Sequence, residues 1–197
     1  MYKRQLHKGR REKGEATAIV SGAHRLGFGE FADRVARLGA ALRQLGMARG
    51  DRVGMMSLNS HRFVEYFFGT WWGGGVVNPV NIRWNPKEVA YSLDDCDTRI
   101  LLVDDLFAPL VGELRRLSTS LRTVVYCGER EVPEGMVGYE ALLAGTAAID
   151  DAPHTGDELA AVMYTGGTTG RPKGVMLSHG SLCIDARGHR FGLSLIH

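Results

Sequence analysis

The segment from residue 165 to residue 174 carries the clearest chemistry in the chain. It reads Thr-Gly-Gly-Thr-Thr-Gly-Arg-Pro-Lys-Gly. Its four glycines let the backbone reach positive φ and turn consecutive N–H groups inward, which forms a nest that binds anions. Three threonine hydroxyls add donors, Lys173 supplies a positive charge for phosphate, and Arg171 can supply another. We therefore predict a phosphate-binding loop here rather than a flexible surface hairpin.

The residues on either side of this loop predict two strands. Ala-Ala-Val-Met-Tyr at 160–164 precedes the loop and Val-Met-Leu at 175–177 follows it, and both are short apolar runs. A Walker A loop instead needs Gly-Lys-[Ser/Thr] leading into a helix, whereas here Pro172 precedes the lysine and Gly174 follows it. The dinucleotide pattern G-x-G-x-x-G is not matched either. The loop therefore belongs to another class of phosphate site.

The elements before the loop alternate between strand and helix patterns. Apolar residues from Phe31 to Leu45 recur at steps of four and three, which indicates a helix that Gly46 ends. We predict a helix that Ser60 caps and the glycines at 73–75 end, a helix that starts at 85–88 with a cap residue, a proline and an acid, and a helix from 106 to 117. We also predict a hairpin of 17–20 with 25–28 and strands at 51–56, 76–77, 100–103 and 123–127. This alternation predicts an α/β fold with a mainly parallel sheet and flanking helices, ending in a strand–phosphate-loop–strand unit.

Composition shifts divide the chain into four predicted parts. Residues 1–16 are rich in Lys and Arg, and we expect a disordered or foreign tail rather than a basic arm for an anionic surface. Residues 17–149 form the α/β subdomain. Residues 150–158 read as a linker, and residues 159–192 hold the strand–loop–strand unit, which we expect to be truncated.

Overall composition excludes several classes of function. Hydrophobic residues make up 44% and charged residues 23% of the chain, which is typical of a globular protein, and the net charge of +2 is too small to indicate nucleic acid. The chain has an odd number of cysteines, Cys96, Cys127 and Cys183, and no two of them form a C-x-x-C pair. We therefore expect reduced thiols in a cytoplasmic protein without an integral membrane segment.

A few other residues invite a functional interpretation. We interpret Trp71 and Trp72 as core residues, because they follow helical spacing with other apolar side chains. The acids at 94, 95 and 97 are expected to be solvated at the end of a helix. His179 is interpreted as a histidine at the end of a strand, with a position lining the pocket as the alternative.

The loop at 165–174 closely resembles the signature of the AMP-forming (adenylate-forming) acyl-activating ligase superfamily, with Gly166 where serine is usual. The resemblance is wider than the loop. Residues 26–31 are similar to the L-T-Y-x-E-L element of the superfamily, 50–53 to its G-D-R-V, and 74–81 to its G-A-V-x-x-P-x-N. Residues 82–95 look particularly like bacterial fatty-acyl-CoA synthetases. The match runs from about residue 17 to residue 184.

This resemblance implies a two-step ligase. A carboxylic acid attacks the α-phosphate of ATP, which gives acyl-adenylate and pyrophosphate, and the thiol of CoA then displaces AMP. The resemblance assigns the β- and γ-phosphates to Thr165, Gly166, Gly167, Thr168, Thr169, Gly170 and Lys173. It also implies that the Thr165 hydroxyl contacts Mg²⁺.

The superfamily places its remaining functional elements after this loop. These are the adenine-binding segment, the magnesium-binding glutamate, the ribose-binding aspartate and the lysine of a mobile C-terminal domain. Because this chain ends 24 residues past Lys173, we expect an N-terminal fragment with no catalytic residue and no ligase activity of its own. A fragment of an aryl-acid- or amino-acid-adenylating enzyme, a non-catalytic nucleotide-binding module and a basic-armed interaction protein are the alternatives.

Overall fold

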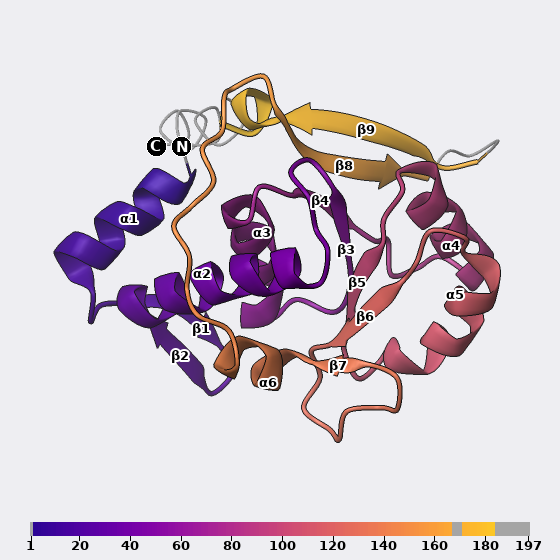
Figure 1. Ribbon diagram of the computed structural model, residues 1–197, viewed down its shortest axis with the longest axis horizontal. Coiled ribbons are helices and arrows are strands. Elements are labelled where there is room, and N and C mark those ends of the chain that lie inside the picture. Colours follow the sequence, from indigo (N-terminus) through magenta and orange to yellow (C-terminus); the bar gives the residue numbers. More distant parts are fainter. Residues whose placement is uncertain (1, 167–170, 184–197) are drawn as a thin grey trace, which may run out of the picture.

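The computed structural model describes residues 2–166 and 171–183 and contains one large sheet covered by helices (Figure 1). The seven strands lie in the order β7 (Val137–Gly138), β6 (Thr123–Tyr126), β5 (Ile100–Val103), β3 (Arg52–Met56), β4 (Val76–Pro79), β8 (Leu159–Thr165) and β9 (Lys173–Ser178). Every neighbouring pair is parallel except β8 with β9. The predicted α/β fold with a mainly parallel sheet is confirmed.

Helices cover both faces of this sheet, as its apolar strands require. Side chains of α2 (Phe28–Gln44), α3 (His61–Trp72) and α6 (Tyr139–Ala144) pack on one face in a cluster that includes Val53, Val77 and Leu102. Side chains of α4 (Pro86–Asp95) and α5 (Val111–Leu117) pack on the other face, with Leu101 and Val124. The predicted hairpin is present as β1 (Thr17–Ser21) and β2 (His24–Gly27).

Local sequence signals fix several helix ends. The Ser60 hydroxyl accepts the first-turn N–H of Phe63 at 3.3 Å, and α4 begins with a capping box between Asn85 and Glu88. The helix that we predicted from residue 106 starts later, because the carboxylate of Asp104 accepts the N–H groups of the next residues and closes a turn. A 3₁₀ turn, η1 (Ala108–Leu110), then leads into α5.

A network of buried charges joins the three helices on the first face. Glu65 in α3 is fully buried, and both of its oxygens accept from the guanidinium of Arg34 in α2, at 2.6 and 3.1 Å. The same carboxylate accepts the hydroxyl of Tyr139 at 2.6 Å. Arg34 also binds Glu140 in α6, which receives a further bond from Arg62. The network ties α6 to the body of the fold.

The N-terminal residues differ from the predicted disordered tail. Residues 2–13 form helix α1 (Tyr2–Lys13), so that prediction is wrong for this stretch. Leu6 is 3% exposed and belongs to an apolar cluster with Leu26, Phe31 and Trp72. One buried leucine and a tilted ring contact between His7 and Trp72, with centroids 4.9 Å apart, anchor this helix. Its many charged residues had led us to expect a disordered tail.

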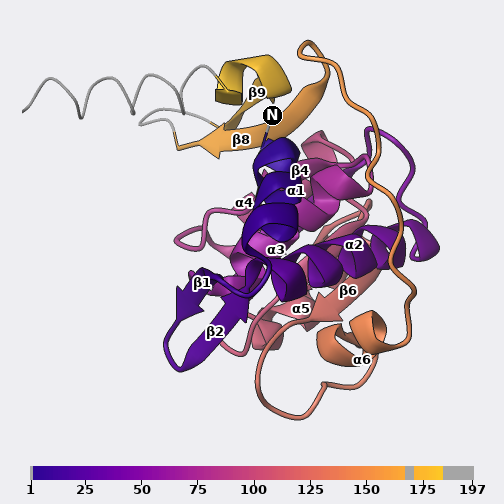
Figure 2. The same ribbon diagram turned by 90° about the vertical axis from the view of Figure 1, so that its left-hand side faces the viewer.

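A long connection from α6 to β8 runs along the helices of the first face (Figure 2). The indole N–H of Trp72 donates to the carbonyl of Ile149 at 2.7 Å, and the N–H of Ala152 donates back to the Trp72 carbonyl at 2.9 Å. The predicted domain boundaries at 17–149, 150–158 and 159–192 stay predictions. The sheet itself continues across them, since β8 pairs with β4 at Ala161 and Val77.

Candidate phosphate-binding site

Strands β8 and β9 form the hairpin that carries the predicted phosphate loop. They are antiparallel, and their last pair before the loop is Thr165 opposite Lys173. Both residues are exposed. The two predicted strands are therefore observed, and Thr165 and Lys173 lie opposite one another where the hairpin opens into the loop.

The structure places only part of the predicted set. Thr165, Gly166 and Lys173 are described and exposed, as is Arg171. The other predicted phosphate ligands, Gly167, Thr168, Thr169 and Gly170, lie outside the described residues. Their assignment to phosphate stays a prediction.

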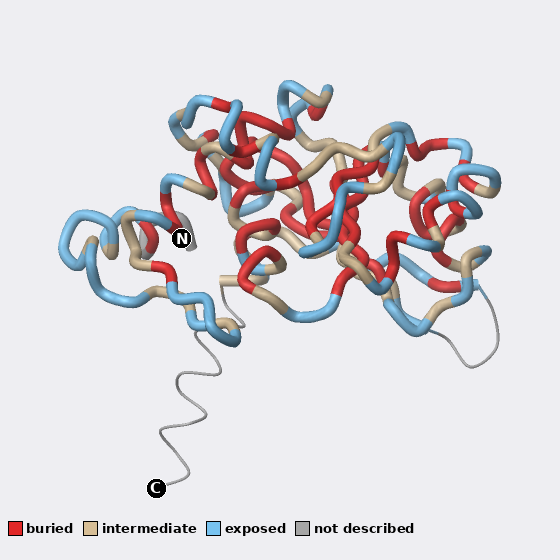
Figure 3. Tube along the Cα trace, turned by 90° about the horizontal axis from the view of Figure 1, so that it is seen from below, coloured by how far each residue is buried: buried red, intermediate tan, exposed pale blue. Residues whose placement is uncertain are grey.

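Exposed residues surround a buried interior (Figure 3), and the direction of β8 decides at which edge of the sheet its exposed last residue lies. Because β8 is parallel to β4, Thr165 lies at the carboxyl edge, where β8 ends beside α4 (Figure 1). Ligands of open α/β sheets bind at this edge.

A tyrosine at the end of β8 anchors the hairpin to α4. The Tyr164 hydroxyl donates to the carboxylate of Asp95 at 2.6 Å. Burial of the phenol, together with this bond to a carboxylate, raises the pKa of Tyr164, so the hydroxyl stays a neutral donor. The Trp84 ring lies edge to face with Tyr164, with centroids 6.2 Å apart. A Cβ at Gly166 would lie 3.9 Å from the Trp84 indole nitrogen, in ordinary contact.

Arg171 is held at the other end of the loop by an aromatic ring. Its guanidinium carbon lies 5.5 Å from the ring centroid of Tyr91 in α4, a distance that favours a cation–π interaction. The charge remains exposed at the loop. Two contacts, at Tyr164 and at Arg171, therefore position the loop against one helix.

These positioning residues were missed by sequence reasoning. Asp95 is exposed, as expected, and its carboxylate also accepts the Tyr164 hydroxyl. Asp94 is half-buried, and its carboxylate accepts bonds from Ser118, Thr119 and Ser120. The sequence signal for these contacts was weak. Nothing in the spacing of the acids shows that a strand about 70 residues later meets Asp95, or that a loop about 25 residues later meets Asp94.

His179 lies far along the hairpin from the phosphate loop. It follows β9, at the end where Ser178 pairs with Leu159. Its side chain is 9% exposed, and its ring lies 4.4 Å from that of His154 and 6.0 Å from that of Trp71, centroid to centroid. The interpretation as a packed histidine at the end of a strand is supported. Trp71 and Trp72 are core residues, as predicted.

The described residues were also compared with the requirements of a metal site and of a membrane-spanning helix. Among them, no group of three or more His, Cys, Asp or Glu side chains is arranged to hold a metal ion. Within the same residues, no helix combines the length and apolar character that crossing a membrane requires. Cys96, Cys127 and Cys183 are free.

Comparison with known proteins identifies the family. The family model described as AMP-binding enzyme matches residues 6–195. The chain is 36% identical over 174 residues to a long-chain-fatty-acid–CoA ligase of Thermus thermophilus, covering 88% of this chain and 31% of that protein. It is 34% identical over 171 residues to a 3-hydroxybenzoate–CoA ligase of Aromatoleum sp., covering 86% and 32%.

Solved structures agree with this match. The anthranilate CoA ligase AuaEII, solved with anthranoyl-AMP, superposes with a TM-score of 0.87 at 27% identity, over 92% of this chain and 35% of that one. The N-terminal domain of FACL13 from Mycobacterium tuberculosis superposes with a TM-score of 0.76 at 28% identity, over 89% and 44%. The chain spans about a third of the length of the curated relatives. It belongs to the AMP-binding enzyme family, as the motifs at 165–174 and 74–81 predicted.

Proposed function

We propose that the protein supplies the phosphate-binding part of an ATP-dependent acid–CoA ligase, which converts a carboxylic acid to an acyl-adenylate and then to an acyl-CoA. The observation that carries this proposal is the β8–β9 hairpin, which closes at Thr165 and Lys173 on the carboxyl edge of the sheet. Membership of the AMP-binding enzyme family supports the same chemistry. The chain spans a third of its relatives, so the complete reaction is a property of the whole ligase.

In this proposal the hairpin stabilises the departing pyrophosphate. The backbone N–H groups of Gly166 and the loop residues after it, together with the ammonium of Lys173, hold the β- and γ-phosphates. Preorganised donors of this kind lower the barrier because they meet charge as it develops on the leaving group. The bond from Tyr164 to Asp95 keeps the loop in place, so that less ordering is needed when ATP binds.

The residues present fit a Mg²⁺ ion that arrives with ATP. The exposed hydroxyl of Thr165 is a hard oxygen ligand, which Mg²⁺ accepts alongside phosphate oxygens and water. The ion would neutralise charge on the phosphates. A protein cage of carboxylates is not required for this role, which agrees with the lack of such a cluster in the described part of the chain.

We propose a fatty acid as the substrate. The motifs at 82–95 and the similarity to the long-chain-fatty-acid–CoA ligase support this choice. An aryl acid is the second candidate, because two curated relatives are named as hydroxybenzoate–CoA ligases and the anthranilate CoA ligase is a structural neighbour. We further propose a cytoplasmic location, which the free cysteines support.

The test uses the longest open reading frame that contains this sequence. The expressed protein is assayed by ATP–pyrophosphate exchange and by trapping acyl-adenylates with hydroxylamine, across straight-chain fatty acids, benzoates and amino acids. We expect exchange that depends on a carboxylic acid, with fatty acids preferred. A clear preference for benzoates or amino acids would reject the fatty-acid proposal alone, whereas no exchange with any acid would reject the ligase.

A further inference from the structure

One tryptophan of the chain differs from the other two in its hydrogen bonding. The indole N–H of Trp71 donates to the carbonyl of Ala160 at 2.9 Å, and that of Trp72 donates to the carbonyl of Ile149 at 2.7 Å. The indole N–H of Trp84 donates to no atom of the described residues. Its nitrogen is also not among their buried side-chain atoms that lack a partner, so a ligand can reach it. Trp84 therefore holds a donor that the fold itself does not use.

The ring that carries this donor is held in place. Trp84 is partly buried and packs against the apolar cluster between the sheet and helices α4 and α5. It also lies edge to face with Tyr164, with ring centroids 6.2 Å apart, and the Tyr164 hydroxyl is fixed by its bond to Asp95. A side chain that is already ordered loses little conformational entropy when it binds a ligand. The donor is therefore preorganised.

The donor faces the start of the phosphate loop. A Cβ built on Gly166 would lie 3.9 Å from Nε1 of Trp84, and no other atom of the tryptophan is as close to that position. Gly166 follows Thr165, the last residue of β8, which lies opposite Lys173. A ligand that binds to the backbone at Gly166 therefore lies next to the indole N–H.

The charges at the loop favour an anion as the acceptor. Lys173 and Arg171 are exposed, and neither forms an ion pair with a described residue. Asp95, the carboxylate that anchors the hairpin, already accepts the Tyr164 hydroxyl. An indole nitrogen is a donor only, so it binds the lone pair of an oxyanion and offers none to a cation.

We propose that Trp84 is a further phosphate-binding residue, whose indole N–H donates to a non-bridging oxygen on the β- or γ-phosphate of ATP. This inference rests on the proposed function of the hairpin and adds to it a side chain from the segment before α4. The indole supplements the backbone N–H groups and Lys173 without adding charge. Its bond strengthens as negative charge develops on the departing pyrophosphate, because hydrogen bonds to ionised acceptors are the stronger ones.

The backbone at Gly166 allows the donor to be moved. Its φ lies outside the left-handed region, and apart from its neighbours in the chain a Cβ there would meet no described atom closer than 3.9 Å. A serine side chain therefore fits without backbone strain. Its hydroxyl would be a donor beside Nε1 of Trp84. Gly166→Ser should thus replace the indole N–H in a protein that lacks it.

The first test follows the three indole N–H signals of the 197-residue chain by NMR during titration with inorganic pyrophosphate and Mg²⁺. We expect a saturable downfield shift of the Trp84 signal, together with a shift of the Gly166 amide. Trp71 and Trp72, whose N–H groups are already bonded to carbonyls, are internal controls. A shift at Gly166 without one at Trp84 would reject the role of Trp84 and leave the phosphate loop standing. No saturable shift at either would reject both.

Butyrate serves as a carboxylate probe in the same titration. An equal or stronger shift of the Trp84 signal with butyrate would show that the indole recognises the acid rather than phosphate, and would overturn the proposal.

Substitutions then assign the contact. Trp84→Phe keeps an aromatic ring beside Tyr164 but removes the donor, and should weaken pyrophosphate binding by about tenfold or more, as the loss of a hydrogen bond to a charged group does. Gly166→Ser should restore most of that loss in the Trp84→Phe protein, yet change the affinity of the parent by less than about threefold, because the two donors serve one oxygen. Trp72→Phe, which loses an indole N–H that bonds Ile149, is the matched control and should bind as the parent does.

Two outcomes would reject the assignment. Unchanged affinity in a folded Trp84→Phe protein, or no recovery on adding Gly166→Ser, would show that the tryptophan only packs against its neighbours. Circular dichroism checks the fold of each variant. If Trp84→Phe does not fold, the indole signal of the parent decides.

Discussion

The centre of the sheet and the β8–β9 hairpin share one carboxyl edge but differ in how they are held. In the centre, Val53, Leu101 and Val124 are at most 1% exposed, whereas Val175 and Met176 in β9 are 43% and 74% exposed. The centre is packed on both faces by helices. The hairpin relies on its own pairing, on β4 and on a few side-chain contacts to α4.

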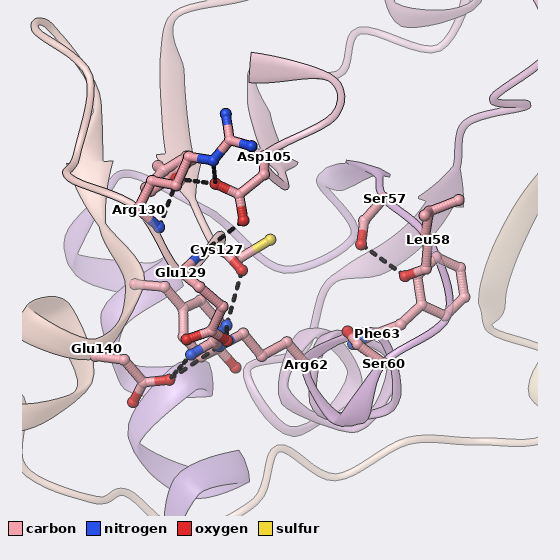
Figure 4. A network of polar contacts seen from close by, with 12 residues as sticks. Ser57, Leu58, Ser60, Arg62, Phe63, Asp105, Cys127, Glu129, Arg130 and Glu140 are labelled. Atoms are coloured by element: carbon pink, nitrogen blue, oxygen red, sulfur yellow. Dashed lines mark hydrogen bonds and ion pairs between the residues drawn. The ribbon is translucent and has the colours of Figure 1, made fainter. Parts of the chain in front are cut away.

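Charge is also used differently in the two regions. On the helices that cover the centre, Arg34 is paired with the buried Glu65, and the buried Arg62 is paired with the exposed Glu129 and Glu140 (Figure 4). At the hairpin, within the described residues, Lys173 has no ion pair and Arg171 rests on an aromatic ring. Charges paired within the protein stabilise the fold, while the unpaired charges remain available for phosphate. The four predictions below test this division of roles.

The largest expected effect on stability comes from Glu65→Ala. This change leaves Arg34 without its buried bidentate partner and Tyr139 without its acceptor. Removing one member of a buried ion pair costs about 3–5 kcal/mol. Urea unfolding of the 197-residue chain measures the change. The exposed Glu134→Ala is the control, and a loss below about 1 kcal/mol would contradict the role assigned to the network.

Lys173→Ala should leave stability unchanged but slow adenylate formation. The expected loss is on the order of 10²–10³ in rate, the effect of one preorganised donor. Formation of the thioester from supplied acyl-adenylate should suffer much less, because pyrophosphate has already left. Both half-reactions are assayed in the longest reading frame, with Lys8→Ala in the exposed part of α1 as the control. Equal losses in both steps would refute the phosphate assignment.

Tyr164→Phe tests the link between the hairpin and α4. Losing the bond to Asp95 should lower the free energy of unfolding by about 1 kcal/mol and weaken ATP binding by a few fold. Tyr91→Phe is a matched control, because its hydroxyl lies 3.4 Å from the same carboxylate and its ring, which faces Arg171, is kept. Urea unfolding and calorimetric titration with ATP give the two values. Identical behaviour of both variants would show that the bond does not position the loop.

The smallest expected effect is a dependence of stability on pH at Asp94. Burial alone would raise the pKa of this carboxyl, but bonds from Ser118, Ser120 and Thr119 lower it overall. The folded pKa therefore lies below the unfolded value of about 3.9, so the stabilisation is complete above that value and is lost as pH falls through the folded pKa.

Asp94→Asn should therefore lower Tm at neutral pH, and the difference from the parent should shrink as the solution is acidified below about pH 4. Thermal unfolding between pH 7 and pH 3 measures this difference, with the exposed Asp157→Asn as the control. A difference that grows on acidification would have the wrong sign and would reject the explanation.

Elements with strong local signals were predictable from the sequence. The apolar period of α2, the capping box of α4 and the apolar runs of β8 and β9 are each contained in a short window. Helix α6, of six residues, was not predicted. A helix so short is marginal by itself, and it is stabilised by burial of Tyr139 and Leu143 against the body. Helix α1 was not predicted either. Its sequence is rich in exposed charged residues, and its burial against the body rests on Leu6.

The residues of the candidate site also fall into two groups, those that a short stretch of sequence predicts and those that it does not. Thr165, Gly166 and Lys173 were predictable, because phosphate chemistry dictates their types and spacing within one loop. Asp95, Tyr91 and Trp84 were not, because each meets the loop only through the fold.

The late return of the chain to β4 has a consequence for the kinetics of folding. Strands β3 to β6 are joined by local crossovers, whereas β8 reaches its partner only after β5, β6 and α6 have been made. Contacts between distant segments form slowly, because a long loop must close first. We therefore expect the centre of the sheet to assemble during synthesis, with the edge of β4 open until β8 arrives. An exposed strand edge invites pairing with another chain, so this interval is when the growing polypeptide most needs protection from aggregation.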